Sequence, residues 1–232
     1  MIPIINSKNK TEFLLKARKK FFFVKENIAS ISFYNAENSD SYEIKAFISD
    51  VFLRFYKAQI KVGFPNLLAV IGLDKTIFAA VGFRSASDNE LFLEQYLDDK
   101  IENIVSQTVG KKINRNEIVE IGSLASDKKG MVRFLYIAIA AYLHSQNYRY
   151  VVATGTEYLQ KYFKKAGLKP IILGDAKQKK LRNQDVDWGS YYKSNPKIML
   201  LNVTSGYRVL KLFLGIKVQT SFEKLYPHLS YE

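Results

Sequence analysis

Hydrophobic residues recur at two different spacings along the chain, and together these spacings predict a domain that mixes helices with strands. In the stretch 41–57 apolar residues recur every three or four positions, which predicts an amphipathic helix. Asp40 and Glu43 have the spacing of a capping box at its start. Short alternating or continuous apolar runs predict strands, and longer periodic runs predict further helices. The predicted strands are 31–35, 66–73, 76–84, 91–97, 117–125, 150–154, 168–173 and 197–203, and the further helices are 99–109, 131–145 and 156–166.

The order of these elements predicts an α/β fold with a mixed, mostly antiparallel sheet flanked by helices. The early meander favours antiparallel pairing, and the later alternation of strands and helices favours helices packed on the sheet. We expect this domain to span 31–204, between a basic N-terminal extension, 1–30, and a basic C-terminal extension, 205–232. Apolar residues recur at helical spacing beside lysines and arginines in 11–20, which predicts a basic amphipathic helix there, and the tail has a similar character.

The composition narrows the chemistry. A chain of 232 residues can bury one sizeable core. It has no cysteine, which excludes a disulfide framework, a thiol nucleophile and a thiolate metal site, and fits a reducing cytosol. Its two histidines, His144 and His228, lie far apart, so we expect no metal site. No apolar run reaches the ~20 residues of a membrane span, and no signal peptide is recognisable. We therefore expect a cytoplasmic protein, and export by another route stays open.

The net charge of +13 is concentrated at the two ends of the chain. Residues 1–30 hold seven Lys/Arg against two acidic residues, and residues 175–232 hold ten against five. This distribution suits an acidic partner, such as an acidic carrier protein or an anionic membrane surface. A lysine-rich surface that only keeps the protein soluble is the alternative interpretation. Nucleic acid is an unlikely partner, because the basic ends are the only feature that favours it.

One segment, EIGSLASDKKGMVRF, has the pattern of an anion site. A strand runs into a turn that carries glycine and lysine, and a long helix begins directly after it. The start of such a helix presents unpaired N–H groups and the positive end of the helix dipole. Lys128, Lys129 and Arg133 add positive charge, and Gly130 permits close approach of the backbone to a ligand. A pyrophosphate is the ligand that this pattern predicts.

The order of the elements around this turn resembles that of the N-acyltransferase (GNAT) superfamily, in which a coenzyme A pyrophosphate loop precedes a long helix. Of that loop's sequence pattern only Lys129-Gly130 is present, and Val132 stands where a small residue is usual. Acyl-homoserine-lactone synthases, which use acyl-carrier protein, have a similarly degenerate loop after a strand with a glutamate. Glu120 looks like that glutamate. The resemblance implies coenzyme A or an acyl-CoA as donor, or an acyl-carrier protein in its place.

A closer resemblance is to the thermostable hemolysin family, and it covers roughly 40–203. It rests on PNLLAVIG, LFLEQYLDDKIE, VEIGSLAS with Gly130, and WGSYY with Pro196. The family is described by a lytic phenotype, whereas its sequence looks like that of an acyltransferase relative. This resemblance implies a GNAT-like fold. It leaves two functions to compare, acyl transfer and a membrane-active role without catalysis.

The donor site implied by these resemblances combines the strand, the turn, the helix start and one later threonine. Its residues would be Gly122, Ser123, Leu124, Lys128, Lys129, Gly130, Met131, Arg133 and Thr154. Glu120 is the candidate general base, because it shares a strand face with apolar residues and burial raises the pKa of a carboxyl group. The alternative for Glu120 is a structural carboxylate paired with a buried basic group.

Glu94, Tyr96 and Asp98 share one face of the predicted strand 91–97, and could bind an amine acceptor. Glu94 is also the second candidate base. The alternative is the exposed polar face of an edge strand. Trp188, in an aromatic cluster after a basic stretch, is a further substrate-binding candidate. Its cluster can also be interpreted as a platform for stacked bases, as a lid over an acyl pocket, or as ordinary core packing.

The function that these observations favour is transfer of an acyl group from a thioester to an amine, catalysed without a metal. Such direct transfer needs no cysteine and no covalent intermediate. The alternative is a non-catalytic protein on the same fold that acts on membranes or interacts with a host.

Overall fold

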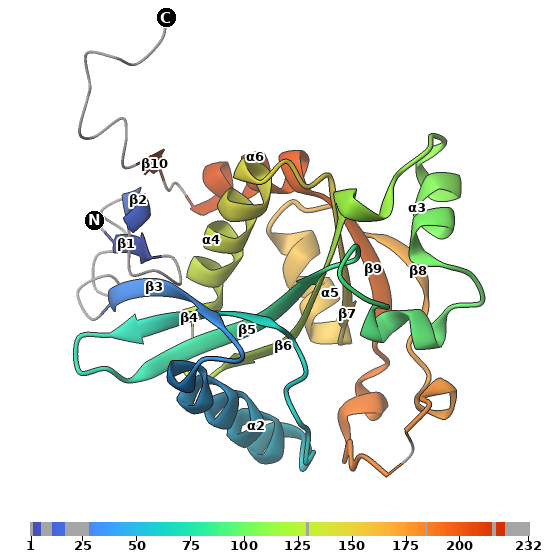
Figure 1. Ribbon diagram of the computed structural model, residues 1–232, viewed down its shortest axis with the longest axis horizontal. Helices are drawn as coiled ribbons and strands as arrows, with labels where there is room; N and C mark the ends of the chain where they lie inside the picture. Colours follow the sequence, from blue (N-terminus) through green and yellow to red (C-terminus); the bar gives the residue numbers. More distant parts are fainter. Residues whose placement is uncertain are drawn as a thin grey trace, which may run out of the picture.

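The computed structural model describes residues 2–5, 11–16, 28–128, 130–183, 185–214 and 217–220, and Figure 1 shows their arrangement. The strands are β1 (Ile2–Ile5), β2 (Thr11–Lys16), β3 (Ile28–Asn35), β4 (Asn66–Gly72), β5 (Ile77–Ser85), β6 (Ile118–Ser126), β7 (Tyr150–Gly155), β8 (Ile171–Asp175), β9 (Lys197–Asn202) and β10 (Lys217–Thr220). The α-helices are α2 (Tyr42–Tyr56), α3 (Ile101–Val109), α4 (Val132–Ser145), α5 (Glu157–Lys165) and α6 (Val203–Leu214). Short 3-10 helices are η2 (Ser39–Ser41), η3 (Phe92–Tyr96), η4 (Arg115–Glu117), η5 (Gln178–Lys180) and η6 (Tyr191–Ser194).

The strands form one sheet in the order β10-β2-β1-β3-β4-β5-β6-β7-β9-β8. Neighbouring strands are antiparallel except in the pairs β1–β3 and β6–β7. Helices cover both faces: α4 and α6 lie against each other on one face, and α2 lies on the other (Figure 1). The predicted α/β class, with a mixed and mostly antiparallel sheet flanked by helices, is confirmed.

The core has three parts, and helices cover each of them with their apolar residues. The largest lies under α4, whose Phe134 and Ile137 are completely buried. The second lies under α2, where Ile44 and Ile48 point to the sheet. The third lies beneath η3 and α3 and includes Leu93. None of the helices that the structure describes is long and apolar enough to cross a membrane.

The described parts of the two basic extensions add strands to one edge of this sheet. Ile2 and Ile4 of β1 are buried, because β1 runs parallel to β3 and joins the hydrophobic core. Strand β2 pairs with β1, and β10 pairs with β2. The helix predicted for 11–20 is therefore wrong over 11–16, which form β2. Residues 17–20 lie outside the described residues.

Three other local predictions also differ from the structure. The segment 91–97 forms the 3-10 helix η3 rather than a strand, because its backbone N–H groups bond to carboxylates and not to a neighbouring strand. The capping box predicted at Asp40 is replaced by Ser41, the residue before α2, whose hydroxyl donates to the carbonyls of Ala36 and Asn38. The strand predicted for 168–173 begins later, at Ile171.

The segment that contains WGSYY is joined to the end of α2. The backbone N–H of Ser190 donates to the carbonyl of Tyr56 at 2.7 Å, and the N–H of Gln59 donates to the carbonyl of Asp187 at 2.7 Å. Gly189 stands directly against the backbone of Tyr56 and Lys57, with φ of +50°. A side chain at this position would collide with that backbone, so the close contact requires glycine.

We expect Gly189→Ala to lower the free energy of unfolding by about 1–3 kcal/mol, through the left-handed backbone and the collision with α2. Gly63→Ala is the matched control, because a Cβ atom at Gly63 would meet nothing within 4 Å. Urea unfolding of both variants and the parent measures the difference. Equal stability of the Gly189→Ala and Gly63→Ala variants would show that the junction does not hold α2.

Candidate functional site

The site forms where the parallel strands β6 and β7 separate. They pair at only four positions, from Ile118–Ile121 on β6 with Tyr150–Ala153 on β7. Beyond these positions β6 also has a bulge. The stretch between Gly122 and Ala125 contains one more residue than the stretch between their pairing partners on β5. Ser123, in this bulge, has a φ of +50°. The bulge turns the strand away from its neighbour, and a gap opens in the sheet.

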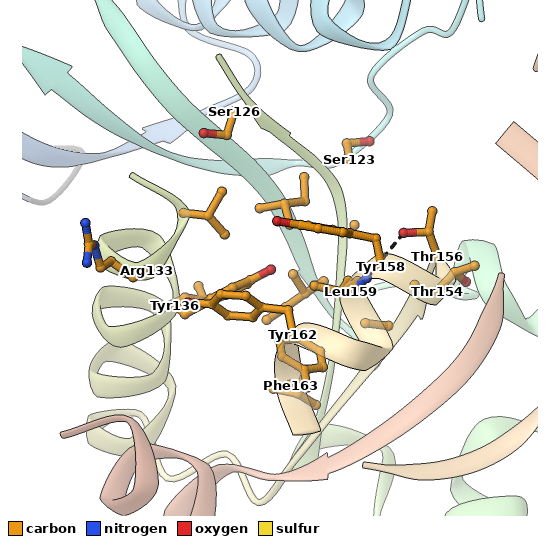
Figure 2. A pocket seen from close by; sticks show the side chains of 18 of the residues that line it. Ser123, Ser126, Arg133, Tyr136, Thr154, Thr156, Tyr158, Leu159, Tyr162 and Phe163 are labelled. Carbon is orange, nitrogen blue, oxygen red and sulfur yellow. Dashed lines mark hydrogen bonds between the residues drawn. The ribbon is translucent and has the colours of Figure 1, made fainter. Parts of the chain in front are cut away.

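This gap opens into a cavity of about 970 Å³. Ser123 of β6 and Thr154 of β7 line it on the sheet, and Tyr158 and Tyr162 of α5 line it on the adjoining helix (Figure 2). The start of α4 lies at one end of the cavity. The end of α2 and Tyr191 also line it, so elements from all parts of the domain meet there. We call it the donor cavity.

The end of the donor cavity at the start of α4 is cationic. Lys128, Gly130 and Arg133 line it. The Nε of Arg133 donates to the carbonyl of Gly130 at 2.6 Å, and Gly130 has a φ of +86°. None of the side chains that the structure describes caps the N-terminus of α4. The N-terminal end of α4, with the positive end of its helix dipole, and two cations at one place favour an anionic ligand.

The other end of the donor cavity is apolar and deep. It reaches between α4 and α6, and Ile139, Leu143 and Leu210 line it. The ring of Tyr136 packs against Phe163, with centroids 5.3 Å apart. Two hydroxyl groups in the cavity wall, those of Tyr136 and Thr154, are buried and have no hydrogen-bond partner within the described residues. Because an unsatisfied buried hydroxyl costs about 1–3 kcal/mol, this wall fits a ligand with polar groups along an apolar chain.

The structure brings together most of the predicted donor-site residues. Those that line the donor cavity are Gly122, Ser123, Leu124, Lys128, Gly130, Arg133 and Thr154. Met131 is placed differently: it is 2% exposed and packs in the core under α4. Lys129 lies outside the described residues.

Glu120 is buried beside this cavity and does not line it. Its carboxylate accepts hydrogen bonds from the backbone N–H groups of Phe92 at 2.9 Å and Leu93 at 3.0 Å. The Nε of Arg84 lies 3.3 Å from its Oε2. Glu120 is 2% exposed, and this burial raises its pKa to about 7, against the opposing effects of Arg84 and the two N–H groups. Glu120 thus fixes η3 on the sheet and has a pKa near neutrality.

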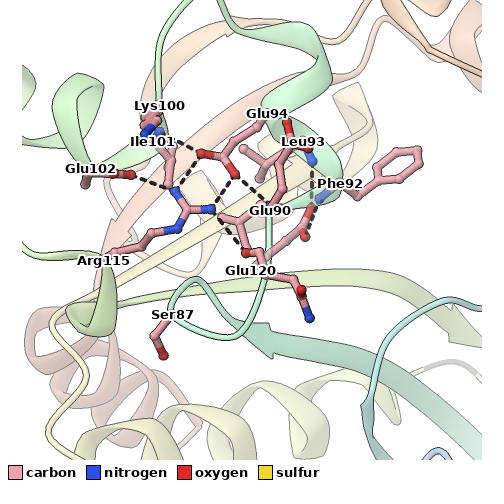
Figure 3. A network of polar contacts seen from close by, with 12 residues as sticks. Ser87, Glu90, Phe92, Leu93, Glu94, Lys100, Ile101, Glu102, Arg115 and Glu120 are labelled. Atoms are coloured by element: carbon pink, nitrogen blue, oxygen red, sulfur yellow. Dashed lines mark hydrogen bonds and ion pairs between the residues drawn. The ribbon is translucent and has the colours of Figure 1, made fainter.

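Glu94, the second candidate base, has its carboxylate oxygens occupied on all sides (Figure 3). Arg115 donates to both oxygens, at 2.7 and 2.6 Å. The backbone N–H groups of Leu91 and Ile101 donate to them as well. Burial alone would raise the pKa of Glu94, but Arg115 and the two N–H groups outweigh burial, and the pKa is lowered. A carboxyl group with a low pKa is a weak base, and this one holds the start of α3.

The other acceptor-site candidates do not form one face. Because 91–97 is a 3-10 helix, Tyr96 is buried while the side chain of Asp98 is 94% exposed and pairs with Lys180. The hydroxyls of Tyr96 and Tyr192 hydrogen-bond at 2.6 Å. Trp188 packs against Tyr192 and the neighbouring aromatic rings, and within the described residues its indole N–H has no partner. The shared polar face predicted for Glu94, Tyr96 and Asp98 is therefore wrong.

Sequence reasoning missed two arginines and most of the cavity wall. Arg84 lies opposite Glu120 in the β5–β6 register, and an arginine inside an apolar strand is the signal that could have revealed it. Arg115 lies in a polar loop and gives no such signal. The wall residues of α2, α4 and α5 have the same periodic pattern as core residues. Among the described residues, no group of three His, Cys, Asp or Glu side chains could hold a metal ion.

The sequence model of the thermostable hemolysin family matches residues 34–207, and the chain belongs to that family. Its structure is similar to the CoA-dependent acyl-homoserine lactone synthase MesI, with a TM-score of 0.51 and 18% identity over 81% of this chain and 96% of that one. It is also similar to BjaI, a CoA-dependent acyl-homoserine lactone synthase solved with SAM and isopentyl-CoA (TM-score 0.52, 13% identity, 80% and 89% covered).

A third similar structure is FeeM, an N-acyl amino acid synthase from uncultured soil microbes (TM-score 0.50, 10% identity, 76% of this chain and 92% of that one covered). At such identities the likeness establishes the fold alone, and it confirms the predicted likeness in layout to acyl-homoserine-lactone synthases. The sequence matches none of the curated proteins.

Removal of Arg115 should destabilise the protein, because it would leave the buried carboxylate of Glu94 without its cation. We expect Arg115→Ala to lower the free energy of unfolding by about 3 kcal/mol. Arg182→Ala is the control: Arg182 pairs with Glu90 in a solvent-exposed ion pair, and its loss should leave the free energy of unfolding nearly unchanged. Denaturant unfolding measures both. Equal losses would mean that the Arg115 pair contributes no more than a surface pair.

Proposed function

We propose that this thermostable hemolysin family protein transfers an acyl group from a thioester donor to an amine. The observation that carries the proposal is the donor cavity, which has a cationic end, a strand gap and a deep apolar end in one continuous space. An acyl-CoA has the same sequence of chemical groups: a pyrophosphate, a pantetheine with amides, and an apolar chain. The similar structures include two CoA-dependent acyl-homoserine lactone synthases and an N-acyl amino acid synthase.

Each part of the donor would meet residues of matching chemistry. Lys128, Arg133 and the N-terminal end of α4 would bind the pyrophosphate. The pantetheine would lie in the gap between β6 and β7, where Thr154 offers a hydroxyl that is unpartnered within the described residues. The acyl chain would fill the apolar end. An acyl-carrier protein would present the same pantetheine arm without the nucleotide, and is the alternative donor.

The reaction needs polarisation of the thioester carbonyl and removal of a proton from the amine. Backbone N–H groups in the Gly122–Leu124 bulge would donate to the carbonyl oxygen, as in an oxyanion hole. The amine nitrogen attacks the carbonyl carbon, the C–N bond forms, and the C–S bond breaks. The amine proton passes to the base, and the leaving thiolate takes up that proton from the base or one from solvent to become a free thiol. The products are an amide and the thiol.

We assign the base to Glu120 rather than Glu94. Glu120 precedes Gly122 on the same face of β6, and its raised pKa suits proton transfer near pH 7. The oxygens of Glu94 are fully engaged by Arg115 and two backbone N–H groups. Acceptance of a proton by Glu120 would weaken its ion pair with Arg84, so the two side chains would adjust together.

The first test is the dependence of donor affinity on chain length. Each buried methylene contributes about 0.8 kcal/mol, so affinity for acyl-CoA should rise about fourfold per methylene until the apolar end is full. Ala140→Phe, which places a ring in this end, should stop the rise at a shorter chain and leave acetyl-CoA binding unchanged. Calorimetric titration of an acyl-CoA series measures both. A parent that binds neither acyl-CoA nor acyl-carrier protein would refute the donor assignment.

The second test is the pH profile of Glu120→Gln. Because only the ionised carboxylate accepts a proton, kcat/KM of the parent should rise with pH through about 7 and then level off. The variant should lack this rise and be slower by a general-base factor of ~100 or more. Glu90→Gln, at an exposed carboxylate near η3, is the control. Thermal unfolding verifies folding, and unchanged turnover in the Glu120→Gln variant would contradict the role of Glu120.

A further inference from the structure

A second, smaller cavity of about 310 Å³ lies on the α2 face of the sheet, beside the Arg84–Glu120 pair. Charged side chains of both signs line it beside apolar residues, and we call it the acceptor pocket. Its lining residues include Glu37, Lys45, Gly63, Phe64, Arg84 and Asp88.

The acceptor pocket is separated from the donor cavity by the ring of Phe64. Gly82 and Gly122 stand opposite each other on β5 and β6, and the ring lies across both. A Cβ atom at Gly122 would be 2.5 Å from the ring Cζ, and one at Gly82 would be 2.6 Å from Cγ. The backbone of Gly122 also lines the donor cavity. Phe64 therefore fills the place where the two cavities would otherwise meet.

Arg84 holds Phe64 and connects the acceptor pocket with Glu120. Its guanidinium lies 4.5 Å from the centroid of the Phe64 ring. One nitrogen, Nη2, donates to the carbonyl of Gly63 at 2.8 Å, and Nε faces Glu120 at 3.3 Å. Within the described residues the buried Nε makes no hydrogen bond. A ligand in the acceptor pocket would thus lie next to the partner of the proposed base.

The charges around the pocket suit a molecule with both an ammonium and a carboxylate. Lys45, which donates to the carbonyl of Ala36, and Arg84 provide two cations. Glu37 and Asp88 provide two carboxylates at the exposed rim, and no described side chain pairs with Glu37. An amine that has no carboxylate would leave the two cations of the pocket without a partner in the ligand.

We propose that the acceptor pocket binds a small zwitterionic amine of the amino-acid class, and that Phe64 is the gate between this amine and the thioester. Lys45 and Arg84 bind the carboxylate, and the rim carboxylates attract the ammonium. Rotation of Phe64 off the glycine pair opens the route to Gly122, where the donor carbonyl lies. With Phe64 in place, water from the pocket is kept from the thioester. This inference rests on the proposed acyl transfer.

Binding can be tested without turnover, so its result is independent of the proposed reaction. The full chain, alone and saturated with coenzyme A, is titrated calorimetrically with each of the twenty standard L-amino acids and with the corresponding decarboxylated amines. We expect binding of at least one amino acid, and about tenfold weaker binding of its decarboxylated amine, because a charge-assisted hydrogen bond is lost.

Glu37→Gln should weaken the same binding by about tenfold, because the ammonium loses a charged partner. Glu43→Gln is the matched control: Glu43 is an exposed glutamate on α2 that does not line the pocket. No binding of any amino acid under either condition overturns the assignment of the pocket. Equal weakening in the two variants, or equal affinity for the decarboxylated amine, also overturns it.

The gate is tested by thiol release from acyl-CoA in the absence of any amine. Phe64→Leu should raise this hydrolysis several-fold, because water reaches the thioester through the opened route. Phe47→Leu, which shortens a half-buried ring of the same core cluster away from both cavities, should not. A thiol reagent reports the release without background, since the chain has no cysteine. Hydrolysis by the Phe64→Leu variant at the parent rate, with donor bound, overturns the gate and leaves the proposed transfer intact.

Discussion

Strands β6 and β7 pair in parallel at four positions and then separate, and the rest of the site depends on this separation. A sheet that opens in its middle leaves strand backbone without ladder partners, and buried polar groups of the backbone need partners. The bulge at Ser123 keeps the two strands apart, because it turns β6 away from β7. Helices α4 and α5 close the gap from one face without filling it. The donor cavity is therefore a product of sheet geometry, to which side chains add specificity.

Two buried carboxylates near the opening show how different partners give one residue type different properties. Glu94 is held by Arg115 through both oxygens, and its pKa is lowered despite burial. Glu120 has one arginine nitrogen at 3.3 Å, and burial raises its pKa to about 7. Both bond to backbone N–H groups and fix the segment around η3. Of these two carboxylates, Glu120 combines the structural role with a pKa that suits proton transfer.

The two cavities divide the proposed acyl transfer between its two substrates. The donor cavity has the length and apolar depth for a thioester with a chain, and the acceptor pocket has mixed charges in a smaller volume. The Phe64 ring separates them at Gly122, where a glycine is needed because the ring lies directly on it. Direct transfer between two bound substrates is consistent with a chain that contains no cysteine nucleophile.

The sequence by itself determined the periodic elements and the contiguous part of the donor site. Helices α2, α4 and α5 follow from apolar spacing, and the run from Gly122 to Arg133 follows from a strand, a turn and a helix start, since all these signals are local. Tertiary structure decided what local spacing cannot contain. The segment 91–97 alternates like a strand, yet it forms η3 because Glu120, far along the chain, captures its N–H groups. Two contacts exist only because β5 and β6 are neighbours. Arg84 pairs with Glu120, and the Phe64 ring packs on two glycines. Hydrogen bonding, burial and pKa depend on which strands become neighbours, and that choice is made by the whole fold.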